Sequence, residues 1–316
     1  MAGPEFRTLD EVAYGQVEQV SPLIRRVIAE NPSKFTYRGT GTYIVGHGEV
    51  VVIDPGPRLD SHRDALAAAL AGERVRAILI THCHADHSPL AEWLAAETGA
   101  PTFAFGPHPQ PDPRLEPPPD PPSGDGDDGE VVIEESTDFE FEPTERVGDG
   151  DVVVSVDGIT MGAVHTPGHT SNHMCWTLGE ESVLFTGDHV MGWSTTVVSP
   201  PDGDMRAYTD SLRRVAGRDD ATLWPTHGPP RDDGRRYVTA LLDHRLAREA
   251  AVLGAVRSGL ATATEIVAVL YADVREELHK PAARSVWAHL SKLVDDGEIV
   301  VASGDLATLD AHYAAV

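Results

Sequence analysis

The segment Thr81-His82-Cys83-His84-Ala85-Asp86-His87 constrains this chain more than any other stretch of its 316 residues. It places three histidines and an aspartate within six residues, a density that ordinary core packing has no reason to produce. Imidazole and carboxylate groups in one place are a ligand set that suits zinc, and manganese or iron would also fit it. The segment therefore predicts a metalloenzyme.

The flanking residues predict that this segment is a loop between a strand and a helix. Residues 75–80 have the pattern of a short buried strand, and residues 88–98 have the periodicity of an amphipathic helix. Where a chain leaves a strand, residues two apart point the same way, so His82 and His84 can converge on one ion. The last two residues of the segment follow the turn and point elsewhere. The spacing thus predicts two adjacent metal positions.

One loop cannot complete two coordination spheres, so further ligands must come from downstream. His169, Asp188 and His227 each follow a short hydrophobic run and are flanked by Gly or Pro, which predicts loops at strand ends. A single histidine in a loop is usually a solvated side chain, but an ordered set behind a four-ligand cluster favours metal ligands. Cys83 alternates with two candidate ligands, so we expect its side chain to face the other way and pack in the core.

In this order of residues the chain resembles the metallo-β-lactamase superfamily. That family has a strand aspartate, a His-x-His-x-Asp-His motif, a lone histidine, an aspartate and a final histidine, which here cover residues 36–230. The resemblance implies a first metal held by His82, His84 and His169, a second held by Asp86, His87 and His227, and Asp188 as the bridge between them. It also implies that Asp54 orients a ligand histidine. The expected cofactors are two Zn²⁺ ions, with Mn²⁺ or Fe as alternatives.

Within the superfamily the chain is similar to the glyoxalase-II-like branch and to its β-lactamase-like protein 2 group, which adds a small winged helix. Residues 39–46, residues 166–173 and the C-terminal tail carry this likeness. The group tends to have Asn where this chain has Gly41, so its substrate contacts are not carried over. His173 is expected either behind the metal ligands or on the substrate side. His189 is expected to be structural and to point away from the metals.

Helical periodicity replaces the strand pattern after residue 230, which divides the chain into a hydrolase domain at 1–230 and a helical linker with a winged helix at 231–316. Helices are predicted at 235–257, 263–271 and 281–296, followed by a strand at 298–301. Thr262 and Glu265 have the spacing of a capping box. The recognition helix would carry only Arg284 and Lys292 as basic residues, so we expect the module to shape the substrate groove and not to read DNA.

Negative charge gathers in one region of a chain whose net charge is −25. Residues 108–149 contain 14 acidic and two basic residues, and residues 107–122 include nine prolines. Such a composition cannot bury enough apolar surface to fold by itself. We therefore predict an acidic Pro-rich surface insertion at about 107–130, with a functional lid as the alternative, and strand pairing that resumes around 131–133.

Basic residues are scarce, which bears on the partners. A nucleic-acid enzyme usually has a basic footprint, because phosphate neutralisation dominates its binding. The arginines beyond His227 either flank the metal cleft or form a solvated helix face; they are Arg231, Arg235, Arg236, Arg245 and Arg248. DNA is thus an unlikely partner, and RNA stays possible.

The sequence also predicts a compartment. No apolar run approaches the roughly 18 residues of a membrane span, and no basic-then-apolar leader is evident, so a cytoplasmic protein without membrane contact is expected. We expect no structural disulfide between Cys83 and Cys175.

The fold expected from these patterns is a four-layer αβ/βα sandwich with a small winged-helix domain, and the expected chemistry is hydrolysis. A hydroxide held by two zinc ions would cleave an ester or thioester of a small-molecule or carrier-bound substrate, with Asp86 and Asp188 as the catalytic carboxylates. One alternative is a single-strand endoribonuclease. The other is a non-catalytic metal-binding or winged-helix regulatory protein.

Overall fold

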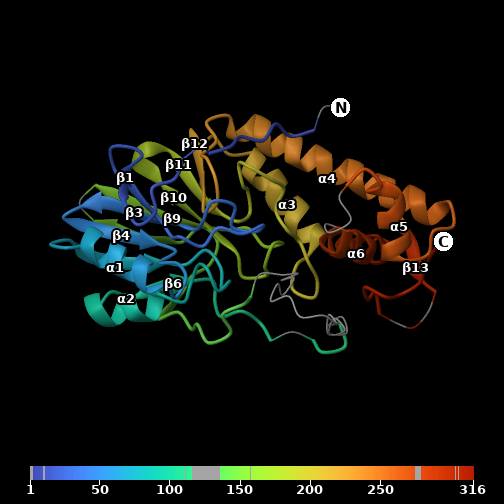
Figure 1. Ribbon diagram of the computed structural model, residues 1–316, viewed down its shortest axis with the longest axis horizontal. Coiled ribbons are helices and arrows are strands. Elements are labelled where there is room, and N and C mark those ends of the chain that lie inside the picture. Colours follow the sequence, from blue (N-terminus) through green and yellow to red (C-terminus); the bar gives the residue numbers. More distant parts are fainter. Residues whose placement is uncertain are drawn as a thin grey trace, which may run out of the picture.

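Two β-sheets face each other in the computed structural model, with helices on both outer faces and a small module at the C-terminal end (Figure 1). The structure describes residues 3–9, 11–110, 112–115, 136–156, 158–274, 279–302, 304 and 306–316. Within these residues, no helix combines the length and apolar character that crossing a membrane requires.

The first sheet has seven strands in chain order. They are β1 (Val17–Gln19), β2 (Ile24–Ile28), β3 (Gly41–His47), β4 (Glu49–Ile53), β5 (Arg74–Leu79), β6 (Thr102–Ala104) and β7 (Glu145–Arg146). The strands from β1 to β4 pair antiparallel, and those from β4 to β7 pair parallel. Helices α1 (Asp60–Ala69) and α2 (Ala91–Thr98) cover its outer face through Leu66 and Leu94.

The second sheet has five strands in the order β12-β11-β10-β9-β8. They are β8 (Val152–Val156), β9 (Ile159–His165), β10 (Met174–Leu178), β11 (Val183–Gly187) and β12 (Thr222–Pro225), with the short helix η1 (Gly179–Glu181) between β10 and β11. Helices α3 (Met205–Ala216) and α4 (Gly234–Arg257) cover the outer face of this sheet through Tyr208, Leu212 and Tyr237.

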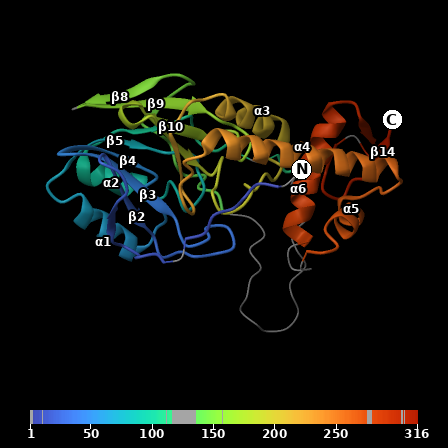
Figure 2. The same ribbon diagram turned by 90° about the horizontal axis from the view of Figure 1, so that it is seen from above.

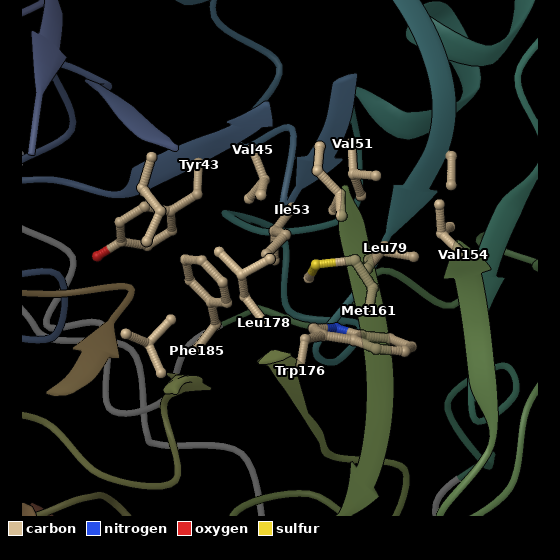
Figure 3. Packing of buried hydrophobic residues seen from close by; sticks show 14 of the residues in the cluster. Tyr43, Val45, Val51, Ile53, Leu79, Val154, Met161, Trp176, Leu178 and Phe185 are labelled. Carbon is tan, nitrogen blue, oxygen red and sulfur yellow. The ribbon is translucent and has the colours of Figure 1, made fainter. Parts of the chain in front are cut away.

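The main core lies between the two sheets (Figure 3). Alternate residues of each strand point inward, as the pleat requires, so Met161 and Trp176 of the second sheet meet Ile53 and Leu79 of the first. The resulting helix, sheet, sheet, helix order confirms the predicted four-layer αβ/βα sandwich.

The strand directions bring distant loops to one edge of this sandwich. Ile53 pairs with Leu79 across the parallel strands β4 and β5, and Gly187 pairs with Pro225 across β11 and β12. Strand β9 runs antiparallel to β10 and therefore in the same direction as β11. The N–H of Met174 donates to the carbonyl of Thr81 at 2.7 Å and joins the two sheets at this edge. The segments that follow β4, β5, β9, β11 and β12 thus converge.

The C-terminal module is a winged helix, as predicted, and it lies beyond the sheets at the far end of α4 (Figure 2). It consists of the end of α4, α5 (Ala263–Leu270), α6 (His279–Asp295), β13 (Ile299–Val301) and β14 (Tyr313–Ala315). The capping box is present: the Glu265 N–H donates to the Thr262 hydroxyl, and the Glu265 carboxylate accepts from the Thr262 N–H. Helix α4 contributes Tyr237 to the core beside the second sheet and Val252 to the winged-helix core.

Two sequence predictions about local structure are wrong in detail. Helix α2 begins at Ala91 and not at Ser88, because the Ser88 hydroxyl donates to Asp138 at 2.7 Å in place of capping the helix. The arginines beyond His227 do not form one solvated face, because Arg231 and Arg245 are buried. The predicted insertion falls between β6 and β7, but residue 111 and residues 116–135 lie outside the described part, including the strand expected at 131–133.

Candidate metal centre

Three imidazoles from two loops meet at the edge where the strands end. His82 Nε2 lies 2.9 Å from His84 Nδ1, which in turn lies 3.2 Å from His169 Nε2. His82 and His84 leave the end of β5, and His169 comes from the turn after β9. Three ring nitrogens that face one another in a buried place form a ligand set for a cation such as zinc.

A second group lies beside the first and contains a carboxylate. Asp86 Oδ2 is 3.4 Å from His87 Nε2 and 3.2 Å from His227 Nε2. Both of these buried ring nitrogens lack a hydrogen-bond partner within the described part of the chain. The Thr40 hydroxyl donates to Asp86 Oδ2 at 2.7 Å and fixes the carboxylate. A buried polar atom without a partner costs free energy, so this arrangement fits a bound cation.

Asp188, which follows β11, faces both groups. Its Oδ2 lies 3.4 Å from His227 Nε2, 3.7 Å from His87 Nε2 and 3.9 Å from His169 Nε2. Its Oδ1 is buried and has no hydrogen-bond partner among the described residues. The side chain therefore occupies the place that a bridging ligand would need.

Three of the imidazoles, those of His87, His169 and His227, are each fixed by an acceptor at Nδ1, the ring nitrogen that points away from the centre. His87 Nδ1 lies 2.9 Å from Asp54 Oδ2, His169 Nδ1 lies 2.6 Å from the carbonyl of Val197, and His227 Nδ1 lies 3.1 Å from the carbonyl of Gly39. Each ring thus donates from Nδ1 and directs Nε2 at the centre, where it can bind a metal ion or hold a proton.

Asp54 binds more than one neighbour. Besides His87, its carboxylate accepts from the N–H of Thr81 at 2.8 Å, from the Thr81 hydroxyl at 2.7 Å and from the Thr226 hydroxyl at 3.2 Å. The residue adopts a left-handed backbone with φ of 49°, which is strained for a side chain other than glycine. Its four hydrogen bonds stabilise that conformation and tie the loops after β4, β5 and β12 together.

Burial and charge act differently on the two groups. Burial and the adjacent imidazoles hold the pKa of His82 well below its ordinary value. Burial also disfavours the charged forms of His87 and His227, but the carboxylates of Asp86 and Asp188 outweigh it and raise both pKa values well above the ordinary one. The second group therefore holds a positive charge strongly, as protons or as a metal ion.

The remaining candidate residues lie behind the ligands. His173 is fully buried, with Nδ1 2.9 Å from the Thr166 hydroxyl and Nε2 accepting from the N–H of Asp188 at 3.2 Å. This hydrogen bond therefore fixes the backbone of Asp188. His189 packs edge-on against Tyr208, with ring centroids 5.1 Å apart.

The two cysteines are buried and free. The amide of Asn172 donates to Cys83 Sγ at 3.1 Å, on the core side of the loop. Burial raises the pKa of both thiols to about 12, so neither cysteine is poised as a nucleophile.

A cavity of about 570 Å³ opens onto His84 and His169 and falls within the range of small-molecule sites. Its walls combine the rings of Phe35 and Phe139 with polar groups that include His108. His108 lies 3.6 Å from Asp202, and its ring centroid is 6.5 Å from that of His84. Sequence reasoning missed His108, because a lone histidine in a Pro-rich segment carries no spacing signal.

Two family profiles match the chain. Residues 37–227 match the Metallo-beta-lactamase superfamily, and residues 262–306 match the Beta-lactamase associated winged helix domain. Among solved structures, a beta-lactamase domain protein from Burkholderia ambifaria superposes with a TM-score of 0.75 and covers 99% of this chain and 97% of that protein. At 22% sequence identity this likeness concerns the fold alone.

Two relatives from fungi share more of the sequence. An atrochrysone carboxyl ACP thioesterase of Aspergillus chevalieri is 32% identical over 295 residues, which cover 90% of this chain and 84% of the relative. The atrochrysone carboxyl ACP thioesterase AgnL7 of Paecilomyces divaricatus is 31% identical over 296 residues, with 90% and 83% covered. The similarity thus extends through both parts of the chain.

Proposed function

The chain belongs to the metallo-beta-lactamase superfamily, and we propose that it is a dinuclear zinc hydrolase that cleaves a carrier-bound thioester. The observation that carries the proposal is the convergence of seven histidine and aspartate side chains beside a cavity that two of them, His84 and His169, line. They are His82, His84, Asp86, His87, His169, Asp188 and His227.

We assign His82, His84 and His169 to one metal and Asp86, His87 and His227 to the other, with Asp188 between them. Two observations on His87 and His227 support this assignment. Their buried Nε2 atoms have no hydrogen-bond partner among the described residues, and their Nδ1 atoms each have a fixed acceptor. Zinc bound here would supply a water of lowered pKa and positive charge for a developing oxyanion. The same imidazole and carboxylate ligands also suit manganese or iron.

The protein's own residues keep the centre ready for this chemistry. Asp86 and Asp188 stay ionised in the buried site, because the neighbouring imidazoles outweigh the burial that would raise the pKa of each carboxyl. The phenyl rings of Phe35 and Phe139 line the cavity and offer apolar contact to an acyl chain. His108 provides a polar contact on the same wall.

The names of the two relatives support a thioester on a carrier protein as the substrate class, since both are called ACP thioesterases. When a metal centre activates water and polarises the carbonyl, hydrolysis of such a bond needs no side-chain nucleophile. The inert cysteines agree with that mechanism.

The test replaces Asp188 with alanine and follows thiol release from acyl thioesters, with a labelled single-stranded RNA assayed in parallel. We expect Asp188→Ala to lose turnover about a hundredfold or more, because the bridging carboxylate is gone. Asp210→Ala is the matched control, since Asp210 lies exposed on α3, where it pairs with Arg213.

Metal content is measured for every variant. Full activity in an Asp188→Ala protein with both metals bound would overturn the mechanism. Metal-dependent cleavage of the RNA without thioester hydrolysis would assign the centre to the endoribonuclease alternative instead.

A further inference from the structure

A second cavity, of about 220 Å³, lies where α4, the start of α6 and residues 195–198 meet. Phe35 and Val197 line both this cavity and the one over the metal centre, so the two cavities share a wall. The carbonyl of Val197 also holds His169 at 2.6 Å. The second cavity therefore lies next to the metal centre.

The second cavity is basic in a chain whose net charge is −25. Its described lining includes His244, Arg245 and Arg248 and contains no carboxylate. Burial and the two adjacent arginine charges lower the pKa of His244. Arg245 and Arg248 have no carboxylate partner among the described residues, and two such like charges side by side favour an anionic ligand.

Arg248 is oriented for such a ligand. Its guanidinium stacks over the ring of Tyr271 at 4.4 Å and donates one hydrogen bond, to the carbonyl of Leu270 at 3.4 Å. A guanidinium has five N–H donors, so the remaining ones are available to oxygens in the cavity. Arg245 beside it donates to the carbonyl of Thr196. Among the described residues, no carboxylate pairs with either arginine, and both belong to the rigid helix α4.

We infer that this cavity binds the phosphate of a phosphopantetheine arm whose thioester lies in the metal cavity. The inference rests on the proposed function and names how the substrate is held. Such an arm carries its phosphate at one end and its thioester at the other, so the anion site must adjoin the metal cavity without being part of it. Arginine forks suit phosphate oxygens, and Phe35 and Val197 offer contact to the arm between the two ends.

The test compares one acyl group on pantetheine, which lacks the phosphate, with the same acyl group on phosphopantetheine. We expect the phosphorylated thioester to have a KM lower by about tenfold to a hundredfold, as a charge-assisted hydrogen bond provides. Arg248→Gln should remove this advantage, Arg248→Lys should keep part of it, and neither should change kcat or the KM of the pantetheine thioester.

Arg236→Gln is the matched control, because Arg236 lies on the same helix, is 73% exposed and pairs with Asp233. Calorimetry with free phosphopantetheine and pantetheine gives a readout besides activity, and thermal unfolding verifies that each variant is folded. The same acyl group on coenzyme A and on a carrier protein distinguishes the two sources of the arm, since the source with the lower KM is the preferred donor.

Equal KM values of the wild-type protein for the two small thioesters would overturn the inference while leaving the proposed function intact. An Arg248→Gln effect of equal size on both thioesters would also overturn it, because the arginine would then act on the fold and not on the phosphate. Absence of hydrolysis of any thioester would overturn the proposed function and this inference with it.

Discussion

Replacing Asp54 with asparagine should damage one metal position and spare the other. Asp54 Oδ2 accepts from His87 Nδ1 at 2.9 Å, whereas the Asn amide nitrogen in that place can only donate. The Thr81 and Thr226 hydroxyls can rotate and accept, but the His87 ring must accept at Nδ1 and move its proton to Nε2. A protonated Nε2 cannot bind a metal.

The expected loss is about tenfold to a hundredfold in metal affinity at the position of Asp86, His87 and His227. The free energy of unfolding should fall by about 1.5 to 3 kcal/mol, the value of a charge-assisted hydrogen bond. A titration against a chromophoric chelator, joined to metal analysis, resolves the two sites. The position of His82, His84 and His169 should keep its affinity.

Asp204→Asn is the control, because Asp204 caps α3 by accepting from the N–H of Ala207 at 2.8 Å and asparagine caps helices equally well. A folded Asp54→Asn protein that binds two metal ions with wild-type affinity would refute the role given to this hydrogen bond.

Two further predictions concern protonation and backbone space. Asp86 and Asp188 raise the pKa values of His87 and His227, so metal binding should displace protons from these rings. Calorimetry in buffers of different ionisation enthalpy counts the protons released, and no release at neutral pH would contradict the assignment. Because both pKa values are raised, the stability they give the metal-free fold is present below the ordinary histidine pKa and is lost as the pH rises through the raised values. Gly168→Ala should destabilise by about 3 kcal/mol or more, since φ is 137° and the new Cβ would lie 2.3 Å from Tyr208 Cα, whereas Gly254→Ala within α4 meets nothing and should stabilise by about 1 kcal/mol. Urea unfolding measures both, and equal stabilities would refute the steric argument.

The sequence predicted the parts of the centre that depend on local chain geometry. The spacing of His82 and His84 predicts convergence, because residues two apart share a face where a strand ends. The winged helix was likewise visible in the helical periodicity and in the capping box of Thr262. Local sequence also indicated His169, Asp188 and His227 as candidate ligands, but only the family order of motifs assigned each of them to a metal position.

Tertiary structure alone decided how the distant groups meet. The parallel register of β11 and β12 places Asp188 within 3.4 Å of His227, and no local sequence pattern encodes that register. The contact of His108 with the metal cavity and the gathering of Arg245 and Arg248 beside Phe35 also arise from packing between segments far apart in the chain. Ligand type is a property of single residues and could therefore be predicted from the sequence. Cavity shape and local charge depend on many distant backbone positions at once, so only the folded chain determines which substrate the centre can reach.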